Sequence, residues 1–269
     1  MSGIDNLIAW LPKDHHELAN KLVTVEMSPY FICIHYCLVT LSMRHRTGSR
    51  EYASEHPFPS WFVCVTSCFG GTLLMNFLLG RPIIQVYSNT SNVIMATLIW
   101  YFVYFSPLDM FYKFTQLKFV KAAMLVLKEV HRIRMISNGV SEASKQHKDS
   151  IIIVTLIGCV KGSGAKFLSR PLDHFIRGNM ISDNEFLKPT FSTKHSVVIS
   201  VLLFGLRAGY FDMKEEMLLA VMFVIAAIAQ TSIFLFEIKD PYEKLEKLLC
   251  NVLLQMPDEV ARSEKSKKE

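Results

Sequence analysis

Residues 118–134 combine apolar side chains with charges at the spacing of one helix face. Successive residues of an α-helix are turned by about 100°, so Lys118, Lys121, Lys128, Glu129 and Arg132 fall within a sector of about 100°. Ionisable side chains deep in an apolar helix usually face a water-filled path or an oppositely charged partner. The stripe therefore predicts either a hydrophilic path or a structural salt bridge in which Glu129 neutralises a cation.

Basic residues near the ends of an apolar helix have a simpler explanation. A long basic side chain can keep its stem in apolar surroundings while its charge reaches the membrane surface. Three residues fit this description: Lys113, Lys118 and Arg134. Arg134 also falls outside the stripe. Three others are expected to lie deeper: Lys121, Lys128 and, in a later segment, Lys161.

The elements that must position these charges are apolar runs near the length of a membrane helix. The chain has 269 residues, of which 51% are hydrophobic, and its mean hydropathy is +0.27. A membrane-spanning helix needs about 20 mostly apolar residues, and the chain has about seven such runs. They are Tyr30–Met43, Ser60–Leu79, Asn92–Ser106, Phe111–Leu127, Ile151–Leu168, Val197–Phe211 and Met217–Phe236. We therefore predict an all-α membrane protein with seven transmembrane helices in residues 1–249, followed by a basic cytosolic tail in residues 250–269.

Loop charges predict the orientation, because Lys and Arg gather in short cytosolic loops. The connections on one side carry many cations: Arg44, Arg46, Arg50, Lys113, Arg170, Arg177, Lys188 and Lys194. This pattern places the C-terminus in the cytosol and the N-terminus on the other side. Lys265 and Lys267 match a K-x-K-x-x retrieval signal, which a receptor reads, although an ordinary basic tail explains them equally well.

Two sequence pairs recur in the same order and suggest an internal duplication. "SPYF" and "SPLD" open the first and fourth runs, and "LLGRPI" and "FLSRPL" close the second and fifth. A unit of three spans enters the membrane in the opposite sense the second time. We therefore expect an inverted 3+3 repeat plus a seventh helix, with the functional site between the halves.

Glycines lie at corresponding places in the second and fifth runs. The second run holds the adjacent pair Gly70 and Gly71, and the fifth holds Gly158, Gly162 and Gly164. Glycines can break a membrane helix where the backbone faces protein or water, or they can let helices pack closely. Both interpretations stay open. Gly139 is expected to lie in a loop.

The cysteines lie mostly inside apolar runs, without polar partners that would complete a metal site. We expect no metal, no enzymatic activity and no binding of nucleic acid.

The stretch "KEVHRIRMI", residues 128–136, resembles the KEVxRxxKI motif of the trimeric intracellular cation (TRIC) channels. The matching positions are Lys128, Glu129, Val130, Arg132 and Ile136. Met135 stands where the family has lysine. The glycine sites, the span count and the inverted repeat also resemble this family, in particular its animal type B branch, over nearly the whole chain.

The resemblance implies a homotrimer in the membrane of the endoplasmic or sarcoplasmic reticulum, with a lumenal N-terminus. Each subunit would conduct K⁺ to balance charge during Ca²⁺ release and uptake. A phosphoinositide, phosphatidylinositol 4,5-bisphosphate, would bind at the pore. Lys128 and Arg132 would hold its phosphates, with donors from Gly71, Thr72, Gly162, Ser163 and Gly164. The pore and its helix breaks would involve Gly70, Gly71, Gly158, Gly162, Lys121, Glu129 and Lys161.

Two other functions are alternatives. A secondary transporter also uses inverted repeats and broken helices, and its basic residues could bind an anionic substrate. A seven-helix receptor would have the same number of spans, but the sequence has no D-R-Y motif after the third run and no N-P-x-x-Y motif in the seventh.

Overall fold

A computed structural model describes residues 20–21, 24–178, 185, 188–238 and 240–243. All regular structure in this part is helical, as predicted. The first half contains α3 (Tyr30–Arg44), α4 (Ser49–Glu55), α5 (Pro57–Cys68), α6 (Gly70–Leu78), the 3₁₀ helix η1 (Ile83–Ser88) and α7 (Thr90–Phe105). The rest contains η2 (Pro107–Asp109), α8 (Met110–Gln116), α9 (Lys118–Gln146), α10 (Ile151–Arg177), α11 (Phe191–Arg207) and α12 (Glu215–Phe236). The predicted basic tail and retrieval signal lie outside the described residues.

Local sequence signals explain several helix ends. Pro57 starts α5, where the missing amide proton of proline is not needed. Asn89 and Ser150 cap α7 and α10 by accepting hydrogen bonds from the backbone amides of Asn92 and Ile153. The α10 helix ends at Arg177 and is followed by Gly178, whose φ of 68° lies in the left-handed region that glycine adopts easily.

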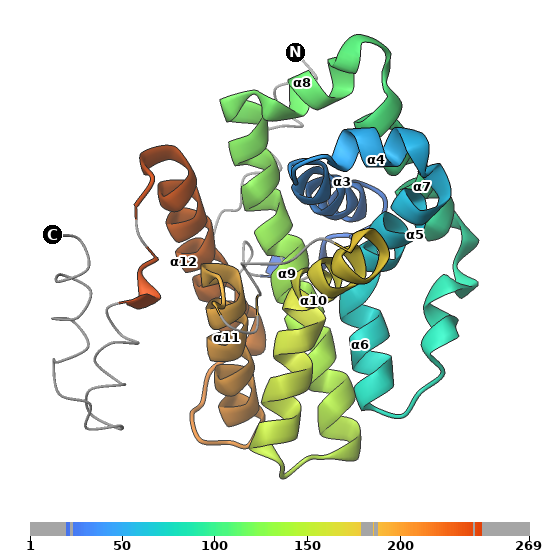
Figure 1. Ribbon diagram of the computed structural model, residues 1–269. Helices are drawn as coiled ribbons and strands as arrows, with labels where there is room; N and C mark the ends of the chain where they lie inside the picture. Colours follow the sequence, from blue (N-terminus) through green and yellow to red (C-terminus); the bar gives the residue numbers. More distant parts are fainter. Residues whose placement is uncertain (1–19, 22–23, 179–184, 186–187, 239, 244–269) are drawn as a thin grey trace, which may run out of the picture.

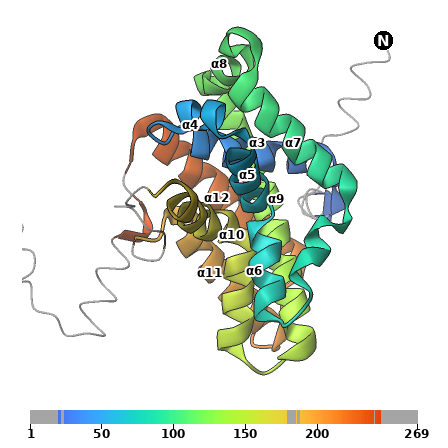
Figure 2. The same cartoon turned by 45° about the vertical axis from the view of Figure 1, so that its right-hand side comes forward.

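The long helices α9 and α10 form the centre of the molecule (Figure 1). Apolar residues of α3, α5 and α7 form one core, against which Ala165 and Leu168 of α10 pack. Residues of α9, α10, α11 and α12 form a second core that contains Ile133, Ile136 and Ile199. Figure 2 shows α7 on the outside of the first group. We call α3–α7 the first group of helices and α9–α12 the second group. The inverted relation between the two halves of the chain stays a prediction.

Two helices in the described part, α10 and α12, have the length and apolar composition of a membrane span. Two bent pairs, α5 with α6 and α7 with α8, raise this number to as many as four if each pair counts as one span. The number of seven therefore stays a prediction, since α3 has only 15 residues, α11 has 17 and α9 is highly charged. Large apolar side chains are exposed along one face of α7: Ile94, Leu98, Tyr101 and Phe102. Such a face suits contact with lipid or another apolar surface.

The fourth predicted span was misplaced. Residues 111–127 are divided between α8 and α9, which meet at Leu117, and α9 continues to Gln146. Gly139 is therefore inside a helix, and the prediction that it lies in a loop is wrong. The average polarity of this part of α9 conceals four buried residues with helical spacing: Ile133, Ile136, Val140 and Ala143.

The glycines of the second and fifth runs meet at a helix crossing. The second run breaks at Phe69, where α5 and α6 differ in direction by 65°. A Cβ atom added to Gly70 would lie 2.8 Å from the carbonyl oxygen of Gly164, and one added to Gly71 would overlap the carbonyl of Lys161. The start of α6 therefore lies directly on the backbone of α10.

Of the two interpretations of the glycines in the fifth run, the structure shows close packing and no break in the helix. The α10 helix continues through Gly158, Gly162 and Gly164 without interruption, and Gly158 and Gly162 lie against neighbouring side chains. Figure 1 shows instead that the course of α10 changes direction along its length. Gly–Ser steps and proline are common causes of such bends, and α10 contains both Gly162–Ser163–Gly164 and Pro171.

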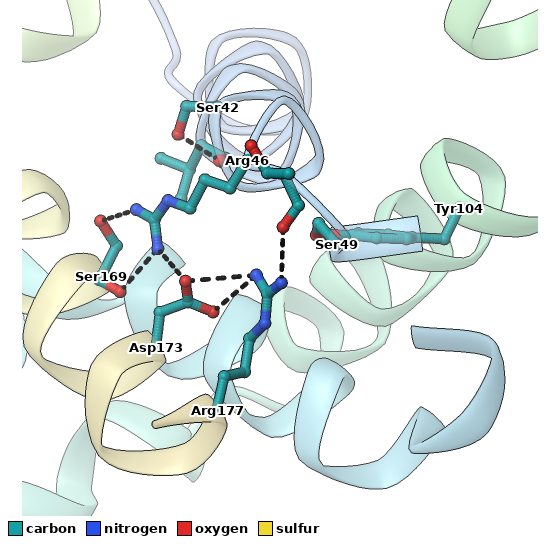
Figure 3. A network of polar contacts seen from close by, with 9 residues as sticks. Ser42, Arg46, Ser49, Tyr104, Ser169, Asp173 and Arg177 are labelled. Atoms are coloured by element: carbon teal, nitrogen blue, oxygen red, sulfur yellow. Dashed lines mark hydrogen bonds and ion pairs between the residues drawn. The ribbon is translucent and has the colours of Figure 1, made fainter. Parts of the chain in front are cut away.

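A polar network joins the two groups of helices at the end of α10 (Figure 3). Arg46, which follows α3, donates to the carbonyl and hydroxyl oxygens of Ser169 at 3.0 Å each and pairs with Asp173 at 3.1 Å. Arg177 also pairs with Asp173, at 3.4 Å, and donates to the carbonyl of Thr47 at 2.8 Å. The α3–α4 connection is thereby fixed to α10.

The close contact of Gly70 and Gly71 with α10 predicts that a larger side chain at either position lowers the stability of the folded protein. Gly71→Leu should destabilise the folded protein by roughly 1–3 kcal/mol or more, because the new side chain would displace the backbone of α10. Gly80→Asn is the matched control, since Gly80 has a φ of 65° and open space around it, and asparagine tolerates this conformation. The measurement is the thermal unfolding midpoint in detergent. Equal midpoints for the two variants would contradict the crossing.

Candidate functional site

A cavity of about 300 Å³ lies between the two groups of helices. Its wall contains seven of the residues that the sequence singled out: Gly71, Thr72, Lys128, Arg132, Lys161, Gly162 and Gly164. These residues come from α6, α9 and α10, and α3 contributes His35. The structure thus brings together parts of the chain that are up to 133 positions apart, counted from Ile32 to Ala165.

The charged side chains among the described residues of this wall are all cations. Lys128 and Arg132 reach it from neighbouring turns of α9, and Lys161 reaches it from α10. The Lys161 ammonium group donates a hydrogen bond of 2.7 Å to the hydroxyl of Thr72. This bond directly joins the start of α6 to the middle of α10. Such a wall favours an anion as its occupant.

Glu129 lies behind the cavity and binds Arg132. The Nη1 atom of Arg132 is 2.6 Å from each carboxylate oxygen of Glu129, and the two side chains are 5% and 1% exposed. The structure records no hydrogen bond from the other guanidinium nitrogens to any residue that it describes. Arg132 can therefore keep its carboxylate partner and still offer two nitrogens to a group in the cavity.

The positive end of a helix also faces this space. The α6 helix begins at Gly70, and Phe69, Gly71 and Thr72 contribute to the wall. The first amides of a helix carry partial positive charge and suit an anionic group. The break at Phe69 therefore has a consequence beyond close packing, because it places a helix start inside the protein at the cavity.

Five predicted site residues lie outside the wall. Gly158 and Ser163 face α11, where they lie against Ser200 and Ser196. Lys121 donates to Gln116 at 3.3 Å, and its charge lies 5.5 Å from the ring centre of Phe234. The other two are Gly70, at the helix crossing, and Glu129, behind Arg132.

A pair of histidines in the wall was missed by the sequence analysis. His35 of α3 and His131 of α9 stack with ring centres 4.5 Å apart. The Nε2 atom of His35 lies 3.1 Å from the carbonyl oxygen of Cys68, and because a carbonyl only accepts, this nitrogen carries the proton. His131 lies within the motif stretch, but nothing in the local sequence indicates that it stacks on a histidine 96 positions earlier. In the described part of the chain, no three His, Cys, Asp or Glu side chains gather as metal ligands.

Comparison with known proteins gives a consistent result. The family model described as TRIC channel matches residues 46–237. Trimeric intracellular cation channel type B-A of Xenopus laevis is 34% identical over 260 residues, which cover 93% of this chain and 89% of that protein. Type 1B.1 of Caenorhabditis elegans is 33% identical over 238 residues, which cover 87% and 80%.

Solved structures agree with the same fold. A structure from work on the "activity of TRIC counter-ion channels in calcium release" superposes with a TM-score of 0.77 at 28% identity, covering 82% of this chain and 99% of that one. A trimeric intracellular cation channel from C. elegans with bound Ca²⁺ has a TM-score of 0.74 at 32% identity, covering 81% and 95%.

The buried ion pair predicts a large cost for removing its acid. Glu129→Gln should destabilise the protein by roughly 3–5 kcal/mol, because Arg132 would keep a buried charge without a carboxylate partner. Lys145→Gln is the control, since it removes the pair with Glu142, in which Lys145 is 64% exposed. That change should cost less than about 1 kcal/mol. Thermal unfolding in detergent compares them, and a Glu129→Gln midpoint no lower than that of Lys145→Gln would contradict the role of the pair.

Proposed function

Because the chain belongs to the TRIC channel family, we propose that it conducts K⁺ across the membrane of the endoplasmic or sarcoplasmic reticulum. The flow would balance charge while Ca²⁺ is released and taken up. The name of the first solved relative, a counter-ion channel in calcium release, supports this role. The names of the curated relatives support a homotrimer as the working form.

The observation that carries the finer proposal is the cationic wall of the central cavity. Lys128, Arg132 and Lys161 face one space together with the start of α6. A cationic wall repels K⁺ unless an anion neutralises it. We propose that a phosphoinositide, phosphatidylinositol 4,5-bisphosphate, is this anion, because lysine, arginine and helix amides are the donors that phosphate groups prefer.

The three cations of the wall differ in their contacts, which supports a different role for each in binding the lipid. Lys128 lines the wall and its ammonium group has three donors, whereas Arg132 is held in place by Glu129. Lys161 links the wall to Thr72 of the broken segment. A bound polyphosphate would contact both α9 and the α6–α10 crossing, and it would reverse the sign of the local field. The cavity volume, about 300 Å³, lies at the lower end of the range for small-molecule sites, about 300–1,000 Å³.

A second candidate function is a transporter of an anionic substrate, which the same cationic wall favours. The two functions differ in the ion that crosses the membrane and in whether transport saturates.

The first functional prediction concerns the permeant ion. Purified protein in a planar bilayer with a KCl gradient should give single-channel currents that reverse near the K⁺ equilibrium potential. Reversal near the Cl⁻ potential would exclude cation conduction. Saturable anion flux without channel currents would support the transporter.

The second functional prediction concerns the lipid. Lys128→Ala should weaken binding of phosphatidylinositol 4,5-bisphosphate by about tenfold to a hundredfold, since a charged hydrogen bond contributes roughly 1.5–3 kcal/mol. The double change of Lys128 and Arg132 to alanine should remove nearly all specific binding. Arg134→Ala should change affinity little, because Arg134 is not part of the wall.

This assay must score folding before binding, since loss of Arg132 leaves Glu129 buried without its partner. Monodisperse elution in detergent is the criterion, followed by titration with lipid vesicles. Unchanged affinity in the folded double variant would overturn the docking role.

A further inference from the structure

The chain turns back after α12 and returns to the first turns of α11 (Figure 1). Three contacts hold it there. The hydroxyl of Tyr242 lies 2.8 Å from Nδ1 of His195, its ring stacks on Phe191 with centres 5.4 Å apart, and Asp240 pairs with Lys194 at 3.2 Å. We name residues 240–242 the clasp.

The direction of the hydrogen bonds makes the clasp specific. His195 has no exposed surface, and its Nε2 atom lies 3.2 Å from the carbonyl of Met222 in α12. A carbonyl only accepts, so Nε2 carries the proton and Nδ1 accepts from Tyr242. Burial, with the Asp240 carboxylate nearby, raises the pKa of Tyr242, which keeps its hydroxyl protonated as the donor. Without Tyr242, a buried acceptor of α11 would have no partner in the described part of the chain.

The residues beside His195 reach the wall of the central cavity. The hydroxyl of Ser196 lies 3.0 Å from that of Ser163 in α10. A Cβ atom added to Gly162, which lines the cavity, would lie 3.1 Å from the same Ser196 hydroxyl. The first turns of α11 therefore support the α10 side of the cavity, next to Lys161.

We propose that the clasp holds α11 against α10 and thereby sets the affinity of the cavity for its anionic lipid, with Tyr242 as the positioning residue. The part of this proposal that concerns the lipid rests on the proposed function. The part that concerns α11 does not.

The protein contains its own reporter for the position of α11. The thiol of Cys159 in α10 is buried and lies 3.9 Å from the carbonyl of Thr193 in α11. Movement of the first turns of α11 away from α10 would expose this thiol. Cys64, buried in the first group of helices, is an internal reference that the clasp does not touch.

The test compares Tyr242→Phe with Tyr210→Phe in the full-length protein. Both changes remove one hydroxyl, but Tyr210 is 77% exposed. Labelling by N-ethylmaleimide is followed at each cysteine by peptide mass spectrometry. Binding is measured with phosphatidylcholine vesicles that contain phosphatidylinositol 4,5-bisphosphate. Tyr242→Phe should speed labelling of Cys159 severalfold relative to Cys64 and weaken lipid binding roughly three- to tenfold. Tyr210→Phe should do neither.

Each outcome decides a different part of the proposal. Unchanged labelling of Cys159 in Tyr242→Phe would overturn the clasp. Faster labelling with unchanged lipid affinity would overturn its link to the cavity. If the unchanged protein binds no phosphoinositide, the proposed lipid is wrong, and labelling still decides whether the clasp holds α11. Should Tyr242→Phe fail to fold, Asp240→Asn removes the charge that pairs with Lys194, while its amide oxygen can still accept from the backbone amide of Tyr242; this change should speed labelling of Cys159 in the same direction.

Discussion

The contact between the start of α6 and the backbone of α10 is the constraint on which the central cavity depends. Gly70 and Gly71 lie against Gly164 and Lys161 so closely that a side chain on either glycine would displace the neighbouring helix. In a membrane, where lipid is as apolar as the helices, close van der Waals contact between small residues is a main source of association. This contact brings Thr72 within 2.7 Å of Lys161 and places the positive end of α6 beside Lys128 on α9.

The same arrangement concentrates positive charge at the interface of the two helix groups. Only Glu129 compensates it within the motif, and both carboxylate oxygens are occupied by one nitrogen of Arg132. Isolated buried charge is unfavourable, so a site with more cations than acids is stable only when water or an anion enters it. The packing of the glycines and the concentration of cations at the cavity are therefore two aspects of one geometry.

The helical stripe predicted that Lys128 and Arg132 share one face of a helix, and the family resemblance implied that they lie at one site with Gly71. All three line the same cavity, while their role in binding stays a prediction. The stacking of His35 on His131 could not be predicted, because it depends on the approach of α3 to α9. The loop predicted around Gly139 came from hydropathy, which follows average polarity and missed the buried stripe on one side of α9. Lys121 lies on the same helix face as Lys128, but it is two turns closer to the start of α9 and does not reach the cavity.

The network at the end of α10 has a consequence for biosynthesis. Arg46 is made early, whereas its partners Ser169 and Asp173 are added more than 120 residues later. At the rates of ribosomal synthesis, about 5–20 residues per second, the interval is at least several seconds. During that time the side chains of Ser169 and Asp173, which bind Arg46 in the folded protein, do not yet exist. The contacts of α3 with α9 can form before α10 is made, whereas the network of Arg46 can form only after α10 has been added to the chain.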